Sequence, residues 1–250
     1  MSVSIRENGE CTAMAGYMIP ECVHASETPA VLTKYTFLHT LDGKEERNMS
    51  FAGVTFVKGK VLAFSDSKST RIKDGKRIEA GSVQKVFKND DLVLTCTGVN
   101  TLPVLKDQKY YVLPLAEWIN GNIQNTASAL DICKRLFDYI RTECVQCIDP
   151  IIMIGAYRLD ENRENCMFFL SEISQNSFSF KEQLISEANS WYSGDDEYLQ
   201  YFNSHPEKLF TTSDVILENE IKKSIREIGN GHGQDWYNPV GGKIQVEILS

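Results

Sequence analysis

Two consecutive pairs of predicted β-strands, between residues 50 and 98, constrain the fold more than any other feature of the chain. The first pair covers Ser50–Val57 and Val61–Ser65, and the second covers Ser82–Phe87 and Leu92–Thr97. β-Branched and aromatic residues fill these runs, whereas Gly, Asn and Asp mark the breaks between them. The pattern therefore predicts two strand pairs, each joined by a short turn.

Polar residues stand at particular places in these strands. Ser50 opens the first strand, and Asp66 follows the second, sixteen residues further on. Lys85 lies within the third strand, nineteen residues after Asp66, and Gly98 follows the fourth, thirteen residues after Lys85. A hydroxyl that opens a strand, with a carboxylate and an ammonium beside it, is the arrangement that an N-terminal nucleophile requires.

This order of residues resembles the opening segment of proteasome β-subunits and their bacterial ring-protease relatives. The matching residues are Ser50 at the nucleophile position, Asp66 within DSKST, Lys85 before a valine, and Gly98. The segment VGGKIQVEI near the C-terminal end resembles the closing strand of the same family. The resemblance implies an α+β fold, a four-layer αββα sandwich of the N-terminal-nucleophile hydrolase type, over residues 50–250.

The resemblance also implies a role for each matching residue. Ser50 would be the nucleophile, and its own α-amine would be the base. Lys85 would lower the pKa of the hydroxyl, and Asp66 would orient Lys85. The backbone N–H of Gly98 would face the oxyanion. Ser193 corresponds to a serine that relays the proton of the nucleophile; its hydroxyl is also a candidate N-cap for the helix that follows, and both roles can hold.

Three positions depart from the family pattern. Tyr237 stands where an aspartate completes the site, and Val240 replaces the usual serine. Met49 stands where precursors usually carry glycine. Residues 1–49 therefore have two interpretations, a propeptide that is cut off to free Ser50 or a permanent N-terminal extension.

Three functions follow as hypotheses. The first is a serine- or threonine-type peptidase that acts on peptides or proteins through Ser50 and needs no cofactor. The second is a catalytically inactive subunit for assembly or binding, which retains its extension and keeps Asp66 and Lys85 as a buried ion pair. The third is hydrolysis of small-molecule amides, because a fold does not fix the substrate. Self-association into a ring is implied only by analogy.

Composition limits which binding partners and which cellular compartment we expect for this chain. A net charge of −8 and a pI near 5.1 argue against nucleic acid as a partner. The sequence has no apolar run of about 18 residues, which predicts no membrane span, and its start does not resemble a secretion signal. Seven cysteines, an odd number, indicate reduced thiols in the cytoplasm. The spacing of His and Cys predicts no metal site.

Apolar spacing predicts two long helices later in the chain. One begins at Thr126, which we expect to be its cap, and the other covers Asp214–Ile228. We expect no regular structure in two segments. These are the polar loop Arg71–Gly81 and the stretch Asn100–Pro114, which contains two prolines. A further strand pair is predicted at Ile151–Leu159 and Cys166–Ile173.

Overall fold

The computed structural model describes residues 50–73, 76–126, 128–145, 149–159, 166–185, 189–233 and 235–249. The chain divides into two units, Met1–Leu32 and Thr33–Ser250, and all described residues belong to the second. The expectation that residues 1–49 form a propeptide or an extension lies outside the described part of the chain.

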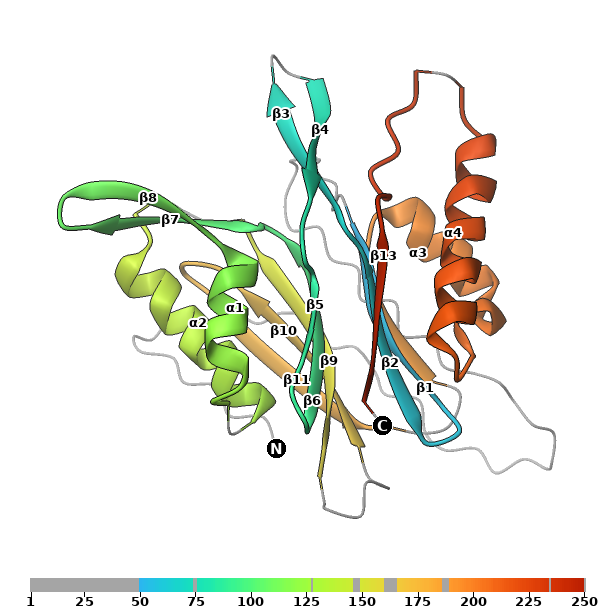
Figure 1. Cartoon of the computed structure of the whole chain (residues 1–250), viewed down its shortest axis with the longest axis horizontal. Coiled ribbons are helices and arrows are strands. Elements are labelled where there is room, and N and C mark those ends of the chain that lie inside the picture. The colour runs from blue at the N-terminus through green and yellow to red at the C-terminus, as the bar shows by residue number, and fades with distance from the viewer. Residues whose placement is uncertain are drawn as a thin grey trace, which may run out of the picture. The chain divides into compact units, whose positions relative to one another are not determined.

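The described strands form four antiparallel sheets (Figure 1). The four-stranded sheet has the order β12-β1-β2-β13, with the bounds Asn189–Gly194, Phe51–Val57, Lys60–Asp66 and Ile244–Leu249. The five-stranded sheet has the order β11-β10-β9-β6-β5, with the bounds Phe178–Leu184, Cys166–Ile173, Ile151–Arg158, Leu92–Gly98 and Val86–Lys88. Two hairpins form sheets of their own: β3-β4, with the bounds Lys68–Lys73 and Lys76–Ser82, and β7-β8, with the bounds Thr101–Lys106 and Lys109–Pro114.

Four α-helices and one 3₁₀ turn complete the described part. Their bounds are α1 Leu115–Ile123, α2 Ala129–Glu143, α3 Asp196–Ser204, the 3₁₀ turn Pro206–Leu209 and α4 Asp214–Asn230. Polar side chains accept hydrogen bonds from the first turns of three helices: Ser128 caps α2, Asp195 caps α3 and Ser213 caps α4. The predicted helix cap at Thr126 is wrong, because the Thr126 hydroxyl donates instead to the carbonyl of Asn122.

Three clusters of buried apolar side chains hold these elements together. The first joins α1 and α2 to the five-stranded sheet, and the second lies between the two larger sheets. The third joins α3 and α4 to the four-stranded sheet, where Phe51 stacks on Phe202 with ring centroids 4.6 Å apart. Successive side chains of β6 point to opposite faces of its sheet and so belong to different clusters. Leu92 and Leu94 face the helices, whereas Val93 faces the other sheet.

The expected four-layer αββα sandwich is wrong for this structure. The described strands form four antiparallel sheets where the expected sandwich has two, and β3-β4 and β7-β8 are hairpins outside the two larger sheets; 46% of the described residues are in strands and 30% in helices. Sheets β3-β4 and β7-β8 arise where the sequence predicted the loop Arg71–Gly81 and the irregular stretch Asn100–Pro114. Strands β4 and β8 are largely exposed, so their sequences show no alternation of apolar and polar residues. In β7 only Leu102 and Val104 are buried, and Pro103 stands between them.

The two predicted strand pairs near residue 50 have different outcomes. The first pair is confirmed as β1 and β2, and the last strand is confirmed as β6. A continuous strand over Ser82–Phe87 is wrong, because β4 ends at Ser82 and β5 begins at Val86. Residues 83–85 between them therefore lie outside any strand.

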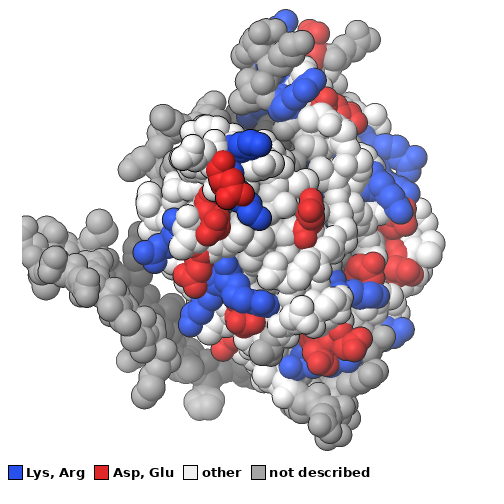
Figure 2. Space-filling model, turned by 60° about the vertical axis from the view of Figure 1, so that its left-hand side comes forward, with Lys and Arg blue, Asp and Glu red and all other residues white. Residues whose placement is uncertain are grey.

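The surface drawn in Figure 2 carries both signs of charge. Lys and Arg lie interspersed with Asp and Glu on this face, and neither sign forms a continuous patch. This face therefore offers no basic strip for a nucleic-acid backbone. Among the described helices, none is both long enough and apolar enough to cross a bilayer.

Candidate functional site

Ser50 lies directly before β1, and its side chain is buried, with 6% of the residue exposed. The end of β12 fixes it there. Phe51 pairs with Gly194, and the N–H of Asp195 donates to the Ser50 carbonyl at 2.9 Å. A Cβ atom at Gly194 would lie 2.0 Å from that carbonyl oxygen, and the residue has φ +148°. Only glycine allows this close approach, so Gly194 holds the start of β1 in place.

Asp66 ends β2, the neighbour of β1, which brings its carboxylate to the first peptide of β1. The N–H of Phe51 donates to Oδ1 at 3.0 Å. The N–H groups of Lys68 and Gly241 donate to Oδ2 at 3.1 and 3.2 Å. The bond from Lys68, two residues further along, is typical of a turn stabilised by an aspartate side chain. The turn and the C-terminal loop together therefore fix the orientation of the carboxylate.

Lys85 reaches both residues from the segment between β4 and β5. Its Nζ donates to Ser50 Oγ at 2.8 Å, to Asp66 Oδ1 at 3.2 Å and to the carbonyl of Lys68 at 2.8 Å. An ammonium has three N–H donors, and each of them has an acceptor here. The structure thus brings together Ser50, Asp66 and Lys85, as the sequence predicted; their catalytic role stays a prediction.

The ion pair between Lys85 and Asp66 is shielded from water, since the two side chains are 7% and 0% exposed. Burial raises the pKa of the Asp66 carboxyl above its ordinary value, and Lys85 with the N–H groups of Phe51 and Gly241 offsets part of that rise. All four hydrogen-bond partners of the carboxylate are donors. The hydrogen bonds at this site therefore match the ionised form of Asp66, which only accepts.

This arrangement can activate a hydroxyl. The positive charge of Lys85, at hydrogen-bond distance from Ser50 Oγ, favours the alkoxide form of the serine. All three N–H donors of Lys85 already have acceptors, one of which is Ser50 Oγ itself. An α-amine at Ser50 has a pKa of about 8 and is suited to take the proton from Oγ. Cleavage of the bond between Met49 and Ser50 would create this amine.

Gly98 and Ser193 are not joined to this network. Gly98 ends β6 with φ +91°, and a Cβ there would lie 2.2 Å from the carbonyl oxygen of Pro150. Gly98 and Lys85 line the same pocket, and the role of the Gly98 N–H as an oxyanion donor stays a prediction. Ser193 pairs with Ala52 across β12 and β1. Among the described residues, no hydrogen bond links Gly98 or Ser193 to Ser50.

The alternative role of Ser193 as a helix cap is wrong. Asp195 occupies the N-cap position of α3, and its side chain accepts from the N–H of Glu197 at 3.1 Å. Aspartate at this position serves as well as serine, and the helix begins two residues later than the alternative required. The role of Ser193 in proton relay stays a prediction.

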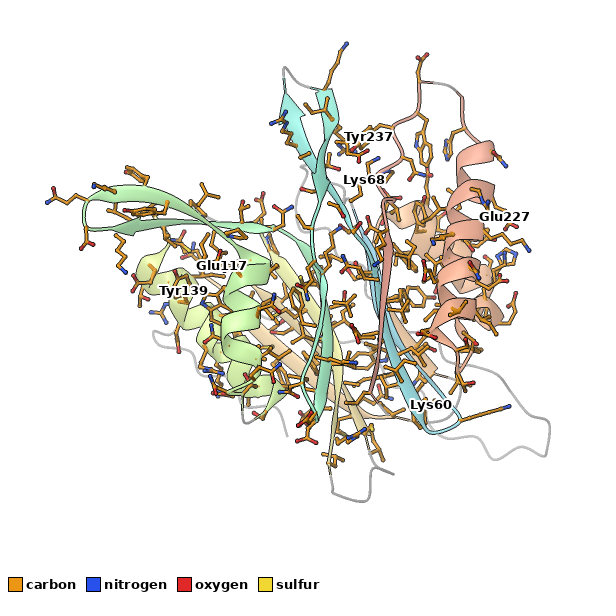
Figure 3. The ribbon with its side chains drawn as sticks, viewed as in Figure 1. Lys60, Lys68, Glu117, Tyr139, Glu227 and Tyr237 are labelled. Atoms are coloured by element: carbon orange, nitrogen blue, oxygen red, sulfur yellow. The ribbon has the colours of Figure 1, made fainter. Side chains whose placement is uncertain are left out.

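The sequence interpretation missed Lys68, whose backbone bonds to both members of the ion pair. Its side chain is held in turn: Nζ donates to the carbonyl of Asn238 at 2.7 Å and lies 4.3 Å from the ring centroid of Tyr237. Figure 3 shows Lys68 and Tyr237 side by side. The Tyr237 hydroxyl is 2.9 Å from Oγ1 of Thr70. Tyr237 thus fixes the turn after Asp66, where the family pattern has an aspartate.

The pocket beside Lys85 also contains a cysteine, Cys96. Burial raises the pKa of the Cys96 thiol to about 12, so it is not a competing thiolate nucleophile. The described residues contain no group of three or more His, Cys, Asp and Glu side chains that could hold a metal ion.

No protein-family model matches the chain, and no curated protein matches it significantly. The resemblance to proteasome β-subunits accordingly depends on the residues quoted from the sequence and stays a prediction.

Proposed function

We propose that the chain is a proteasome-like N-terminal-nucleophile hydrolase that cleaves peptide bonds with Ser50 after residues 1–49 are removed. The observation that supports this most is the bridge made by Lys85, which donates to Ser50 Oγ at 2.8 Å and to Asp66 at 3.2 Å. The proposal depends on these side chains and not on the arrangement of layers, because function belongs to the site more than to the fold.

The reaction follows from the charges at the site. The α-amine of Ser50 takes the proton from Oγ, directly or through one water, and Oγ attacks the peptide carbonyl. Lys85 stabilises the negative charge on Oγ as the proton leaves, and the N–H of Gly98 donates to the oxyanion. The protonated amine then gives its proton to the departing amine of the substrate. Water hydrolyses the remaining ester and restores Ser50.

The proposal includes a peptide or protein substrate, self-association into a ring and a cytoplasmic location. The location is supported by the cysteines, because Cys96, Cys133, Cys144 and Cys166 are buried free thiols in the described part of the chain. Free thiols are typical of a reducing compartment.

A catalytically inactive subunit is the second candidate, and two observations favour it. Ser50 is only 6% exposed in the intact chain, so a substrate has little access to its hydroxyl. Tyr237 binds Thr70 and Lys68 where the family pattern has an aspartate. In this function the ion pair of Lys85 and Asp66 would stabilise the start of β1 without taking part in a reaction.

Intact mass of the purified chain, followed during incubation, separates the two candidates. Loss of the first 49 residues, together with turnover of fluorogenic peptides, supports the hydrolase. Ser50→Ala should then abolish both, while Ser193→Ala tests the proposed proton relay separately. A full-length wild-type chain after prolonged incubation, with no turnover of peptides, contradicts the hydrolase. If the chain hydrolyses small amides and no peptides, its substrate class is small-molecule amides and not peptides.

A further inference from the structure

Gln245, the second residue of β13, makes three hydrogen bonds to the backbone of residues 83–86. Its Oε1 accepts from the N–H of Lys85 at 2.8 Å and from the N–H of Val86 at 3.2 Å. Its Nε2 donates to the carbonyl of Val83 at 2.7 Å. One side-chain amide therefore takes the place that a neighbouring strand would occupy beside residues 83–86.

These bonds determine where the backbone of Lys85 lies. Residues 83–85 belong to no strand, so the N–H of Lys85 has no partner within a sheet. The Lys85 carbonyl accepts from the N–H of Cys96 in β6 at 3.1 Å. The two backbone groups of Lys85 are thus held from opposite sides, by Gln245 of the four-stranded sheet and by Cys96 of the five-stranded sheet.

The same strand is also next to Asp66. In the pairing of β13 with β2, Ile244 lies opposite Asp66 and Gln245 lies opposite Ser65. Gln245 therefore connects the segment that carries the ammonium to the strand that carries the carboxylate. A displacement of Lys85 by about 1 Å would lengthen its contacts with Ser50 and Asp66 beyond hydrogen-bond distance.

We infer that Gln245 is a positioning residue, which sets the distance from Lys85 to Ser50 and Asp66 and so controls activation of the Ser50 hydroxyl. For its effect on catalysis, the inference rests on the proposed function. Its structural part, the placement of the Lys85 ammonium, stands independently of any reaction.

The test compares Gln245→Met, which keeps the length of the side chain and removes all three bonds, with Gln245→Glu. The carboxylate of Gln245→Glu still accepts from Lys85 and Val86 but does not donate to Val83. We expect Gln245→Met to lower kcat for peptide hydrolysis by about 10- to 100-fold with little change in KM. Gln245→Glu should recover part of that loss.

Gln84→Met is the matched control. Gln84 lies in the same segment, and its side chain bonds to the Val86 carbonyl at 3.1 Å and to Asn120 at 3.0 Å, without contacting Lys85. This variant removes a glutamine next to Lys85 and should keep kcat within about two-fold of wild type, an effect typical of exposed positions. An equal loss of kcat in both variants would overturn the inference.

A second readout does not depend on hydrolysis. In the full chain labelled with ¹⁵N-lysine, the ammonium of Lys85 is assigned by comparison with Lys85→Arg. Because it is buried and fully hydrogen-bonded, its protons should exchange slowly with water. Gln245→Met should shift this signal and speed its exchange by at least about ten-fold, whereas Gln84→Met should leave it unchanged.

The two readouts separate the inference from the proposed function. An inactive wild-type chain whose Lys85 signal changes in Gln245→Met contradicts the hydrolase and supports the positioning role. An active wild-type chain whose Lys85 signal and kcat both stay the same in Gln245→Met contradicts the positioning role alone. Melting temperatures of all variants identify any that fail to fold. If Gln245→Met does not fold, Gln245→Glu is compared with Gln84→Met in its place.

Discussion

The described part of the molecule contains two groups of an ammonium, a carboxylate and a hydroxyl, and they differ in their exposure to water. In the first, Lys85 and Asp66 are 7% and 0% exposed and contact Ser50. In the second, Lys208 and Glu227 are 15% and 40% exposed, lie 2.8 Å apart and contact Tyr201. The same three kinds of group therefore occur at a buried strand end and on the surface beside α4.

The difference lies in what water does to each group. Lys208 and Tyr201 lower the pKa of Glu227 to about 2, and the same hydrogen bonds raise the pKa of Lys208 above its ordinary value. Water screens such a surface pair, so its charges act weakly on other groups. At the buried site there is little water to screen Lys85, and its charge acts directly on Ser50 Oγ. Burial makes the first group suitable for chemistry, whereas the second serves to join α3 and α4.

The largest difference is expected on removal of the two lysines. Lys85→Met leaves the Asp66 carboxylate buried without its ion-pair partner, which should destabilise the fold by about 3–5 kcal/mol. It should also lower peptide hydrolysis by about 10³-fold or more. Lys208→Met should leave hydrolysis unchanged. Unfolding in urea and turnover of a fluorogenic peptide measure both effects.

The double variant Lys85→Met/Asp66→Asn keeps this comparison usable if the single variant does not fold. It removes both charges of the ion pair and should recover much of the stability but none of the hydrolysis. Equal losses of hydrolysis in Lys85→Met and Lys208→Met would show that burial does not distinguish the two groups.

A smaller effect is expected from Gly194→Ala, which acts on the backbone that holds Ser50. The added Cβ would lie 2.0 Å from the Ser50 carbonyl oxygen, so the start of β1 must move. We expect a loss of roughly 3 kcal/mol in the free energy of unfolding, with hydrolysis reduced in the fraction that folds. Gly59→Ala is the control, because φ is +76° there but no atom lies within 4 Å of the added Cβ. A loss of about 1 kcal/mol is expected for it, and equal losses would contradict the role of Gly194.

The smallest effect is a pH dependence at the surface group. The pKa of Glu227 falls from 4.5 to about 2 on folding. A carboxyl with a depressed pKa in the folded state stabilises the fold above pH 4.5, and this contribution disappears as the pH falls toward 2. The stability difference between wild type and Glu227→Gln should therefore shrink over this range. A difference that is constant with pH would contradict the ion pair with Lys208.

The three residues that meet at the buried site were predicted from their places along three predicted strands and from the resemblance to proteasome β-subunits. The sequence did not predict the bonds that hold them. Gly241 bonds to Asp66 across 175 residues, and Gln245 bonds to Lys85 across 160. Nothing near Lys85 in the sequence shows that a distant side chain interrupts its strand, so Ser82–Phe87 was predicted as continuous.

The fold class was wrong for a related reason. Strands β1, β2 and β6 are buried along almost their whole length, and their runs of β-branched and aromatic residues made them predictable. Strands β4 and β8 are largely exposed, the β3-β4 segment is rich in charged residues, and the β7-β8 segment contains Pro103 and Pro114. Whether such a segment forms a ribbon depends on its turn and on contacts with the rest of the molecule, which a local pattern does not contain.

The most direct test of the central claim is to locate the acyl group after brief treatment of the purified, incubated protein with an activated ester. Peptide mapping by mass spectrometry identifies the modified residue in wild type and in Lys85→Met. We predict that one acyl group is found on residue 50, at the new N-terminus of the wild-type chain, and that Lys85→Met carries none there. An unmodified Ser50, or equal modification of Ser50 in both proteins, would contradict the activation of this hydroxyl by Lys85.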